Sequence, residues 1–342
     1  SRSAMQNLLT STSMKRSVLI ICCVLLIVAF MLSVALGQTS IPFQLVYDAF
    51  FNYDASNAEH VIIRTSRFTR AVVATVVGAS LAIAGALMRA LTRNPLAAPD
   101  ILGVNAGALF FIVCAITFFS MDSLIHYMWV AFLGAGIAGV LVFFLGSLGR
   151  DGLTPIKIVL AGAAISALFV SFTQGLLVID EQGIQSVLFW LAGSVSGRDI
   201  NMLLPVLPFI VLGGSFAFFM GRSINILQSG DDIAKGLGQR TILTKVFMGI
   251  IVILLAGGSV AVAGSIGFIG LIVPHMAMGL VGTDYRWIIP FSAVIGSTLL
   301  LLADIAARFV IMPLEMPIGV MTAFIGAPFF IYIARRGLAR NA

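Results

Sequence analysis

Long apolar stretches separated by short polar segments are the feature that most constrains how this chain can fold. Of its 342 residues, 60% are hydrophobic and only 10% are charged, whereas soluble domains carry about 25% charged residues. The apolar stretches are near 20 residues long, the length at which an α-helix crosses a bilayer core. We therefore expect an all-α integral membrane protein, and we exclude a water-soluble enzyme, a disordered chain and a coiled coil.

Ten transmembrane helices are expected from these stretches. The sequence predicts them at 17–36, 68–91, 101–120, 127–147, 156–178, 203–221, 241–262, 265–282, 287–307 and 317–335. They form a single domain over 17–336, and the cytoplasmic tails are expected at 1–16 and 337–342.

The distribution of charge predicts an orientation in which both termini are cytoplasmic. With the N-terminus inside, 15 of the 20 Lys and Arg residues lie in cytoplasmic segments, as the positive-inside rule requires. The other five lie outside: Arg64, Arg67, Arg70, Arg198 and Arg308. We interpret the net charge of +6 as this topology signal and expect no nucleic-acid partner.

The N-terminal segment can be interpreted in two ways. Lys15 and Arg16 before the run 17–36 resemble the charged and apolar regions of a signal peptide. The run is long for that role and nine more spans follow, so we expect an uncleaved first helix. Ser1–Ala4 could be a remnant ahead of a native start at Met5 or Met14.

Two short segments resemble each other at a fixed separation. The stretches 78–85 (GASLAIAG) and 257–264 (GGSVAVAG) match at five of eight positions, and the same offset of 179 residues pairs Pro95 with Pro274. In the expected topology one copy runs inward and the other outward, which indicates an inverted internal repeat of the kind common in transporters. The alternative is chance similarity, because Gly and Ala are frequent in membrane helices.

The chain lacks the sequence of an energy-transducing site. It contains no Gly-Lys dipeptide, so it has no GxxxxGK[ST] phosphate-binding loop. Ion-coupled carriers usually keep ionisable groups inside the membrane, but nearly every charge here falls at a predicted helix end. Asp304 is the most buried candidate, and its spacing from Arg308 favours an i,i+4 ion pair over a proton relay.

The remaining patterns predict neither a metal site nor an enzyme. The three histidines, His60, His126 and His275, have no metal-ligand spacing and no Cys/His cluster beside them. No GxSxG elbow marks a nucleophilic serine. We expect no catalytic residue and no bound metal.

An ordered series of motifs closely resembles the permeases that import iron–siderophore complexes, haem and vitamin B12, which are type II ABC importers. The first motif joins Arg67 and Arg70 to the 78–85 segment and to 93–103 (RNPLAAPDILG). The later motifs are 189–194 (FWLAGS), 230–238 (GDDIAKGLG), 267–275 (GFIGLIVPH) and 302–304 (LAD), followed by Arg308, Glu315, Pro317, Gly319, Gly326 and Pro328. The resemblance covers nearly the whole chain from about residue 60.

The resemblance implies a type II importer fold of ten helices and a defined set of partners. These are a second permease subunit, two cytoplasmic ATPase subunits that use ATP and Mg, and an external substrate-binding protein. No cofactor is expected on the permease itself, and the location is the bacterial cytoplasmic membrane. In the family, outer arginines take carboxylates of the binding protein, and the matching positions here are Arg67, Arg70 and Arg308. Arginine suits this role because it binds carboxylates bidentately, although interfacial anchoring is the alternative.

The resemblance also assigns a coupling segment and a path. Short helices at 222–242 would enter a cleft of the ATPase, and the matching residues are Gly230, Asp231, Asp232, Ala234, Leu237 and Gly238. The fifth and tenth helices would line the substrate path, with Ser166, Ser171, Thr173, Gln174 and Thr322. Local bonding within a helix is the alternative for these hydroxyl groups.

Two positions depart from the family pattern. Residue 89 is Arg where glutamine is common, and residue 278 is Met where arginine often stands.

The sequence predicts an importer permease, with ferric siderophores as the expected cargo and haem or vitamin B12 as the alternative. A secondary transporter driven by an ion gradient is the rival class, and a channel is a third possibility.

Overall fold

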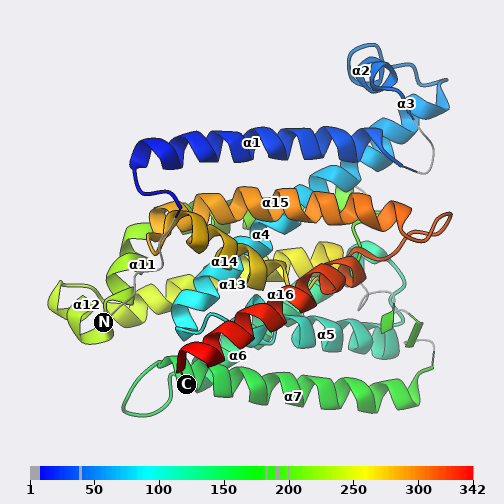
Figure 1. The fold of residues 1–342 in the computed structure, drawn as a ribbon. Coiled ribbons are helices and arrows are strands. Elements are labelled where there is room, and N and C mark those ends of the chain that lie inside the picture. The colour runs from blue at the N-terminus through cyan, green and yellow to red at the C-terminus, as the bar shows by residue number, and fades with distance from the viewer. Residues whose placement is uncertain are drawn as a thin grey trace.

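The chain folds into a bundle of α-helices (Figure 1). The computed structural model describes residues 8–37, 41–181, 184–185, 187–188, 193–198 and 200–341. The long helices are α1 (Thr12–Ala35), α4 (Phe68–Thr92), α5 (Val104–Phe119), α6 (Leu124–Gly146), α7 (Pro155–Ile179), α10 (Leu207–Phe219), α13 (Thr241–Ala263), α14 (Ile269–Val281), α15 (Tyr285–Phe309) and α16 (Ile318–Asn341). The short ones are α2 (Phe43–Phe51), α3 (Ala58–Ile62), η1 (Ile63–Arg67), η2 (Pro99–Leu102), α9 (Ile200–Leu203), α11 (Gly221–Gln228) and α12 (Asp231–Gly236).

Each of the ten predicted spans coincides with one apolar helix of the described chain. Seven of these helices are long enough to cross a membrane alone, counting α3 to α4 as one continuous helix. The pair α10 and α11, which bends by 56° at Met220, counts as an eighth if the two helices form one broken span. The last two, α5 and α14, are apolar but only 16 and 13 residues long.

The two short helices correct the predicted starts of spans 101–120 and 265–282. A 3-10 turn occupies Pro99–Leu102, and Gly103 takes a left-handed φ of 70° before α5 begins. The segment 264–268 is not helical, and Phe268 has a φ of 71°. Hydropathy averaged over a window could not indicate these breaks, because their few polar and small residues stand next to Ile, Leu and Phe. Asn105, in the first turn of α5, donates to Ser265 Oγ at 3.3 Å, so the two breaks lie near each other inside the protein, where non-helical backbone is tolerated.

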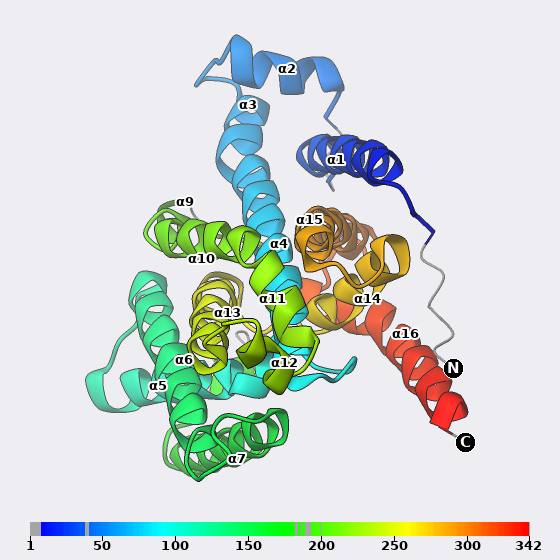
Figure 2. The same ribbon diagram turned by 90° about the vertical axis from the view of Figure 1, so that its left-hand side faces the viewer.

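Helix α4 forms the centre of the bundle (Figure 2). Its apolar segment is 78% buried, compared with 28% for α7 and 22% for α16. α13, α14 and α15 pack around α4, and α1 packs on the far side of α15. The two copies of the repeated segment lie in α4 and at the end of α13, which run in opposite directions.

Glycine allows the closest of these contacts. A Cβ atom on Gly85 of α4 would overlap the backbone carbonyl of Gly270 in α14, and one on Gly78 would overlap the carbonyl of Gly296 in α15. Without side chains the two backbones touch, as they do in many membrane helix pairs. This contact fixes α4 against both neighbours.

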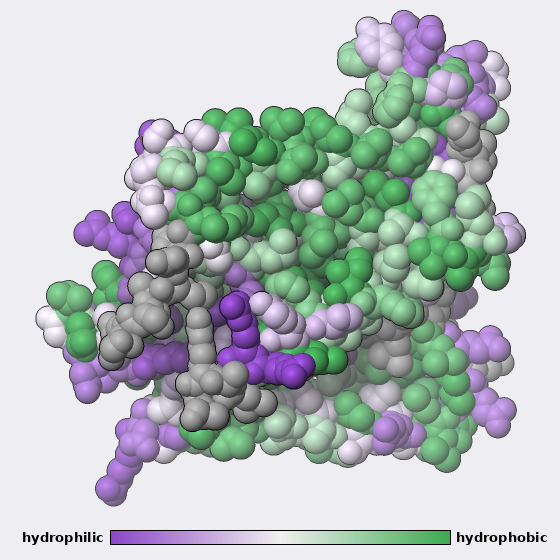
Figure 3. All heavy atoms as spheres, in the orientation of Figure 1, coloured by the Kyte–Doolittle hydropathy of each residue, from purple (hydrophilic) through white to green (hydrophobic). Residues whose placement is uncertain are grey.

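The two ends of the bundle are polar and its flank is apolar (Figure 3). Hydrophobic side chains cover the flank along α1 and α15, where lipid would contact the protein. α1 begins and α16 ends at the end that carries α11 and α12 (Figure 1), which we call the α12 end. The opposite end, which carries Asp304, is called the Asp304 end. The start of α1 and the end of α16 lie at the same end of the bundle, as the predicted topology requires. Which end faces the cytoplasm stays a prediction.

Candidate functional site

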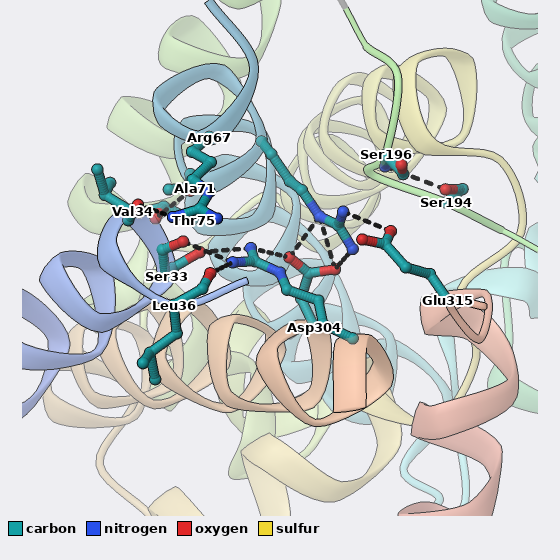
Figure 4. Close-up of polar contacts among 12 residues, drawn as sticks. Ser33, Val34, Leu36, Arg67, Ala71, Thr75, Ser194, Ser196, Asp304 and Glu315 are labelled. Carbon is teal, nitrogen blue, oxygen red and sulfur yellow. Dashed lines mark hydrogen bonds and ion pairs between the residues drawn. The ribbon is translucent and has the colours of Figure 1, made fainter. Parts of the chain in front are cut away.

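A buried carboxylate organises the Asp304 end (Figure 4). Asp304 of α15 is 1% exposed and accepts hydrogen bonds from two arginines. Arg70 of α4 donates to it through Nε at 2.9 Å and Nη2 at 2.8 Å, and Arg308 donates through Nη2 at 2.7 Å. Arg70 Nη1 also donates to Glu315 at 2.7 Å. The predicted Asp304–Arg308 pair is therefore confirmed, and Arg70 is a partner that the local spacing could not indicate.

Arg67 and Arg308 also bind the C-terminal end of α1. Arg308 Nη1 donates to the carbonyls of Ser33 and Leu36, each at 2.6 Å, and Arg67 Nη1 donates to the carbonyl of Ala35 at 2.9 Å. The last carbonyls of a helix have no partner within it and carry partial negative charge, so two guanidinium groups stabilise them. This is a structural role, and it requires both side chains to lie inside the protein.

The three predicted docking arginines therefore lie together but differ in access. Arg67 and Arg308 are 8% and 2% exposed, so neither presents a free guanidinium in this conformation. Arg70, whose side chain is 11% exposed, borders a cavity of 190 Å³ whose lining also includes Ser194, Ser196 and Glu315. Docking stays a prediction for all three, and access favours Arg70. Arg64, outside this group, stacks on Tyr53 at 4.4 Å from the ring centre.

Asp231 attaches the short helix α12 of the coupling segment to the rest of the bundle. Its carboxylate accepts hydrogen bonds from Lys245 at 2.8 Å and from Arg93 at 3.1 Å. Burial tends to raise the pKa of Asp231, but Lys245 and Arg93 outweigh that effect and hold the pKa below its ordinary value. Lys245 also donates to the carbonyl of Leu153 at 2.8 Å. One carboxylate thus joins α12 to α13 and to the turn after α4.

Two large apolar side chains are exposed on α12 and its C-cap residue, next to the exposed charges of Asp232 and Lys235. Ile233 and Leu237 are 57% and 68% exposed and stand four residues apart, on one side of the helix. Ala234 is fully buried and packs inward. Gly230 and Gly238 flank the helix with φ values of 115° and 87°, a conformation that glycine adopts without strain. Of the predicted coupling residues, Asp232, Leu237 and Gly238 are exposed. Ile233 is exposed too but was not among the predicted residues.

A cavity of 710 Å³ opens beside α11 at the same end. Its lining residues are Arg89, Arg93, Asn94, Pro95, Asn225, Gln228, Ser229, Met278, Thr283, Asp284 and Tyr285. Arg89 and Met278, the two departures from the family pattern, both line it. Nη1 of Arg89 is buried and has no hydrogen-bond partner among the described residues.

The predicted path residues divide by exposure. Thr173 and Thr322 are buried, at 3% and 2% exposed, and their hydroxyls donate to carbonyls of their own helices. They do not line an open surface of this chain. Ser171 and Gln174 are exposed on α7, and Ser166 is half-buried, so the path stays a prediction for these three. Residues 189–192 of the FWLAGS motif lie outside the described residues.

The fold and the two ends together define a class of protein. The chain is a multi-pass helical membrane protein in which the polar contacts lie at both ends, and no group of three metal-ligating side chains occurs in the described ranges. A family model described as the FecCD transport family matches residues 25–336. The chain belongs to this family. It is the membrane-spanning permease of an ABC transporter and not the ATPase, as the sequence predicts.

Relatives and a solved structure agree with this assignment. A probable siderophore transport permease of Bacillus subtilis, YfiZ, is 54% identical over 95% of this chain and 97% of its own length. The ferric enterobactin permease FepD of Escherichia coli is 40% identical over 91% of this chain and 93% of its own. A structure assigned to the metal-chelate type of ABC transporter, in an inward-facing conformation, superimposes with a TM-score of 0.81 at 28% identity. The superimposed region covers 94% of this chain and 99% of the chain in that structure.

Proposed function

We propose that this permease carries ferric siderophores or related iron chelates across the bacterial cytoplasmic membrane in an ATP-driven importer. The observation that carries the proposal is the 54% identity to a siderophore permease over nearly the full length of both chains. Relatives named for iron–hydroxamate and iron–citrate import, at 44% and 42% identity, point to the same class of cargo.

The cycle assigns a partner to each end of the bundle. A loaded binding protein docks at the Asp304 end, through the edge of Arg70 that borders the cavity. The cytoplasmic ATPase docks at the α12 end, and its cycle of ATP binding and hydrolysis alternates access through α11 and α12. The cargo crosses between two permease subunits, and both termini lie in the cytoplasm.

Uptake into proteoliposomes tests the cargo. The permease, its ATPase and its binding protein are reconstituted, and uptake of iron-55 siderophore is compared with uptake of haem and of cobalt-57 cobalamin. We expect ATP-dependent accumulation of iron that excess unlabelled siderophore suppresses. Accumulation of haem or cobalamin alone would replace the proposed cargo. Uptake that follows an ion gradient without ATP would contradict the importer mechanism.

The apolar face of α12 should determine ATPase binding. Replacing both Ile233 and Leu237 with Asp removes two side chains whose burial contributes about 1.5–3 kcal/mol each. We therefore expect the affinity for the ATPase to fall by about a hundredfold or more, measured by titration in detergent. Leu148→Asp is the control, because Leu148 is 53% exposed in the turn between α6 and α7. Equal affinities for all three proteins would exclude this face as the contact.

Arg70 should contribute to docking of the binding protein. A hydrogen bond to a charged group contributes about 1.5–3 kcal/mol, so Arg70→Gln should weaken binding by about tenfold or more in a surface-immobilised assay. Arg64→Gln is the control, because Arg64 lies at the same end but stacks on Tyr53. If Arg64→Gln has the larger effect, the docking contact lies nearer α2 and α3.

A further inference from the structure

The cavity beside α11 carries excess positive charge. Arg89 and Arg93 both line it, and its one lining carboxylate, Asp284, is already paired with Arg286 at 2.8 Å. Burial alone would raise the pKa of Asp284, but hydrogen bonds from Arg286 and Asn225 outweigh it and lower the pKa to about 2. This carboxylate is therefore ionised at neutral pH, and its charge is balanced by Arg286 rather than by Arg89.

Arg89 has bonding capacity that the described chain does not use. Its Nη1 is shielded from solvent and has no acceptor among the described residues. The side chain as a whole is half-buried and lines the cavity, so an acceptor in the cavity approaches the guanidinium through its accessible atoms. Met278, on the α14 side of the same cavity, offers no strong acceptor. A guanidinium presents five donors in a fixed fork that matches a carboxylate, and leaving such a donor unpaired in a buried position is unfavourable. The complementary group for this cavity is an anion.

The position of the cavity identifies the source of that anion. Gln228, at its rim, donates to the carbonyl of Ala90 at 3.0 Å and so ties α11 to the end of α4. The exposed Ile233 and Leu237 of α12 follow within nine residues along the chain. Figure 2, which looks onto this end, shows α11 and α12 lying in front of α4. Arg93, which lines the cavity, donates to Asp231 of α12 at 3.1 Å, so a partner that covers α12 lies beside the cavity.

We propose that an aspartate or glutamate side chain of the ATPase enters this cavity and pairs with Arg89, forming a second, ionic contact beside the apolar contact of α12. The proposal rests on the proposed function, because it requires the ATPase at the α12 end. Arg222, Lys235 and Arg240, in α11, in α12 and just before α13, are also exposed, and their charge favours an acidic partner surface at this end. Arg93 is available only in part, because it also holds Asp231.

Affinity measured at two salt concentrations tests the ionic contact on the intact permease–ATPase complex. Arg89→Gln should weaken ATPase binding by about tenfold at low salt, and the difference from wild type should shrink at high salt because ions screen the pair. Arg150→Gln is the control, since Arg150 is exposed in the loop between α6 and α7 and lies outside the cavity lining. It should change binding less than threefold. Equal salt dependence for Arg89→Gln and wild type would overturn the proposal.

A photo-crosslinking residue at Thr283, which is exposed and lines the cavity, identifies the occupant directly. Mass spectrometry should find a crosslinked ATPase peptide that contains Asp or Glu. Crosslinks to lipid alone would mean that the occupant is a lipid anion. If no ATPase crosslink forms, and inorganic phosphate stabilises wild type but not Arg89→Gln, the occupant is a small anion. Failure of the proposed function would differ, because wild type itself would then bind no ATPase.

Discussion

Replacing Asp304 with Ala should destabilise the permease by about 3–5 kcal/mol, the usual cost of removing one member of a buried ionic group. Asp304 is 1% exposed and is the carboxylate that both Arg70 and Arg308 bind. Without it, two positive charges remain close together, and Arg308 is only 2% exposed. The free energy of unfolding can be measured by SDS titration in mixed micelles, and the thermal midpoint should fall with it.

Glu315→Ala is the control for this loss. Glu315 binds the same Arg70, but its side chain is 34% exposed, and exposed ion pairs contribute about 0–1 kcal/mol. Asp304→Asn should lie between the two, because it keeps the shape and one acceptor but loses the charge. If Asp304→Ala costs no more than Glu315→Ala, the buried carboxylate does not hold α4 and α15 together.

The spans were predictable because membrane thickness sets the length of an apolar helix. Their interruptions were not, since Gly103 and Phe268 take left-handed backbone conformations inside apolar sequence. Hydropathy measures the composition of a window and does not register a single backbone angle. The starts of α5 and α14 therefore differ from the sequence prediction, although both helices exist where they were expected.

The candidate sites were predictable where the spacing is local. Asp304 and Arg308 stand one helical turn apart, so their pairing follows from the sequence. Ile233 and Leu237 have the same spacing, but the sequence analysis did not use it. Arg70 is 234 residues from Asp304, and no periodicity links them. Arg67 was expected at an accessible helix end, yet it binds the carbonyl of Ala35 at the end of α1. The acceptor of Arg67 is a carbonyl at the C-terminal end of another helix. The sequence does not show that this helix ends beside Arg67.

Replacing Gly85 with Leu should prevent α4 from packing against α14. A Cβ atom at Gly85 would overlap the carbonyl, the carbonyl carbon and the Cα of Gly270, and backbone cannot move aside as a flexible side chain can. Overpacking a core costs typically about 1–3 kcal/mol, and this site lies at or above that range because α4 is the central helix. We expect most of the protein to aggregate, measured as loss of the monodisperse peak in size-exclusion chromatography.

Gly214→Leu separates this effect from a general intolerance of leucine at helical glycines. Gly214 lies within α10, and no atom lies within 4 Å of the position that its Cβ would take, so this variant should elute as wild type does. Gly85→Ala adds only the first atom and should lower the thermal midpoint while leaving some folded protein. A Cβ atom on Gly270 would meet the side chain of Pro99 at 2.6 Å and the carbonyl of Leu81 in α4 at 2.9 Å, so Gly270→Ala should also lower the thermal midpoint. Normal folding of both alanine variants would mean that α4 and α14 can separate without cost.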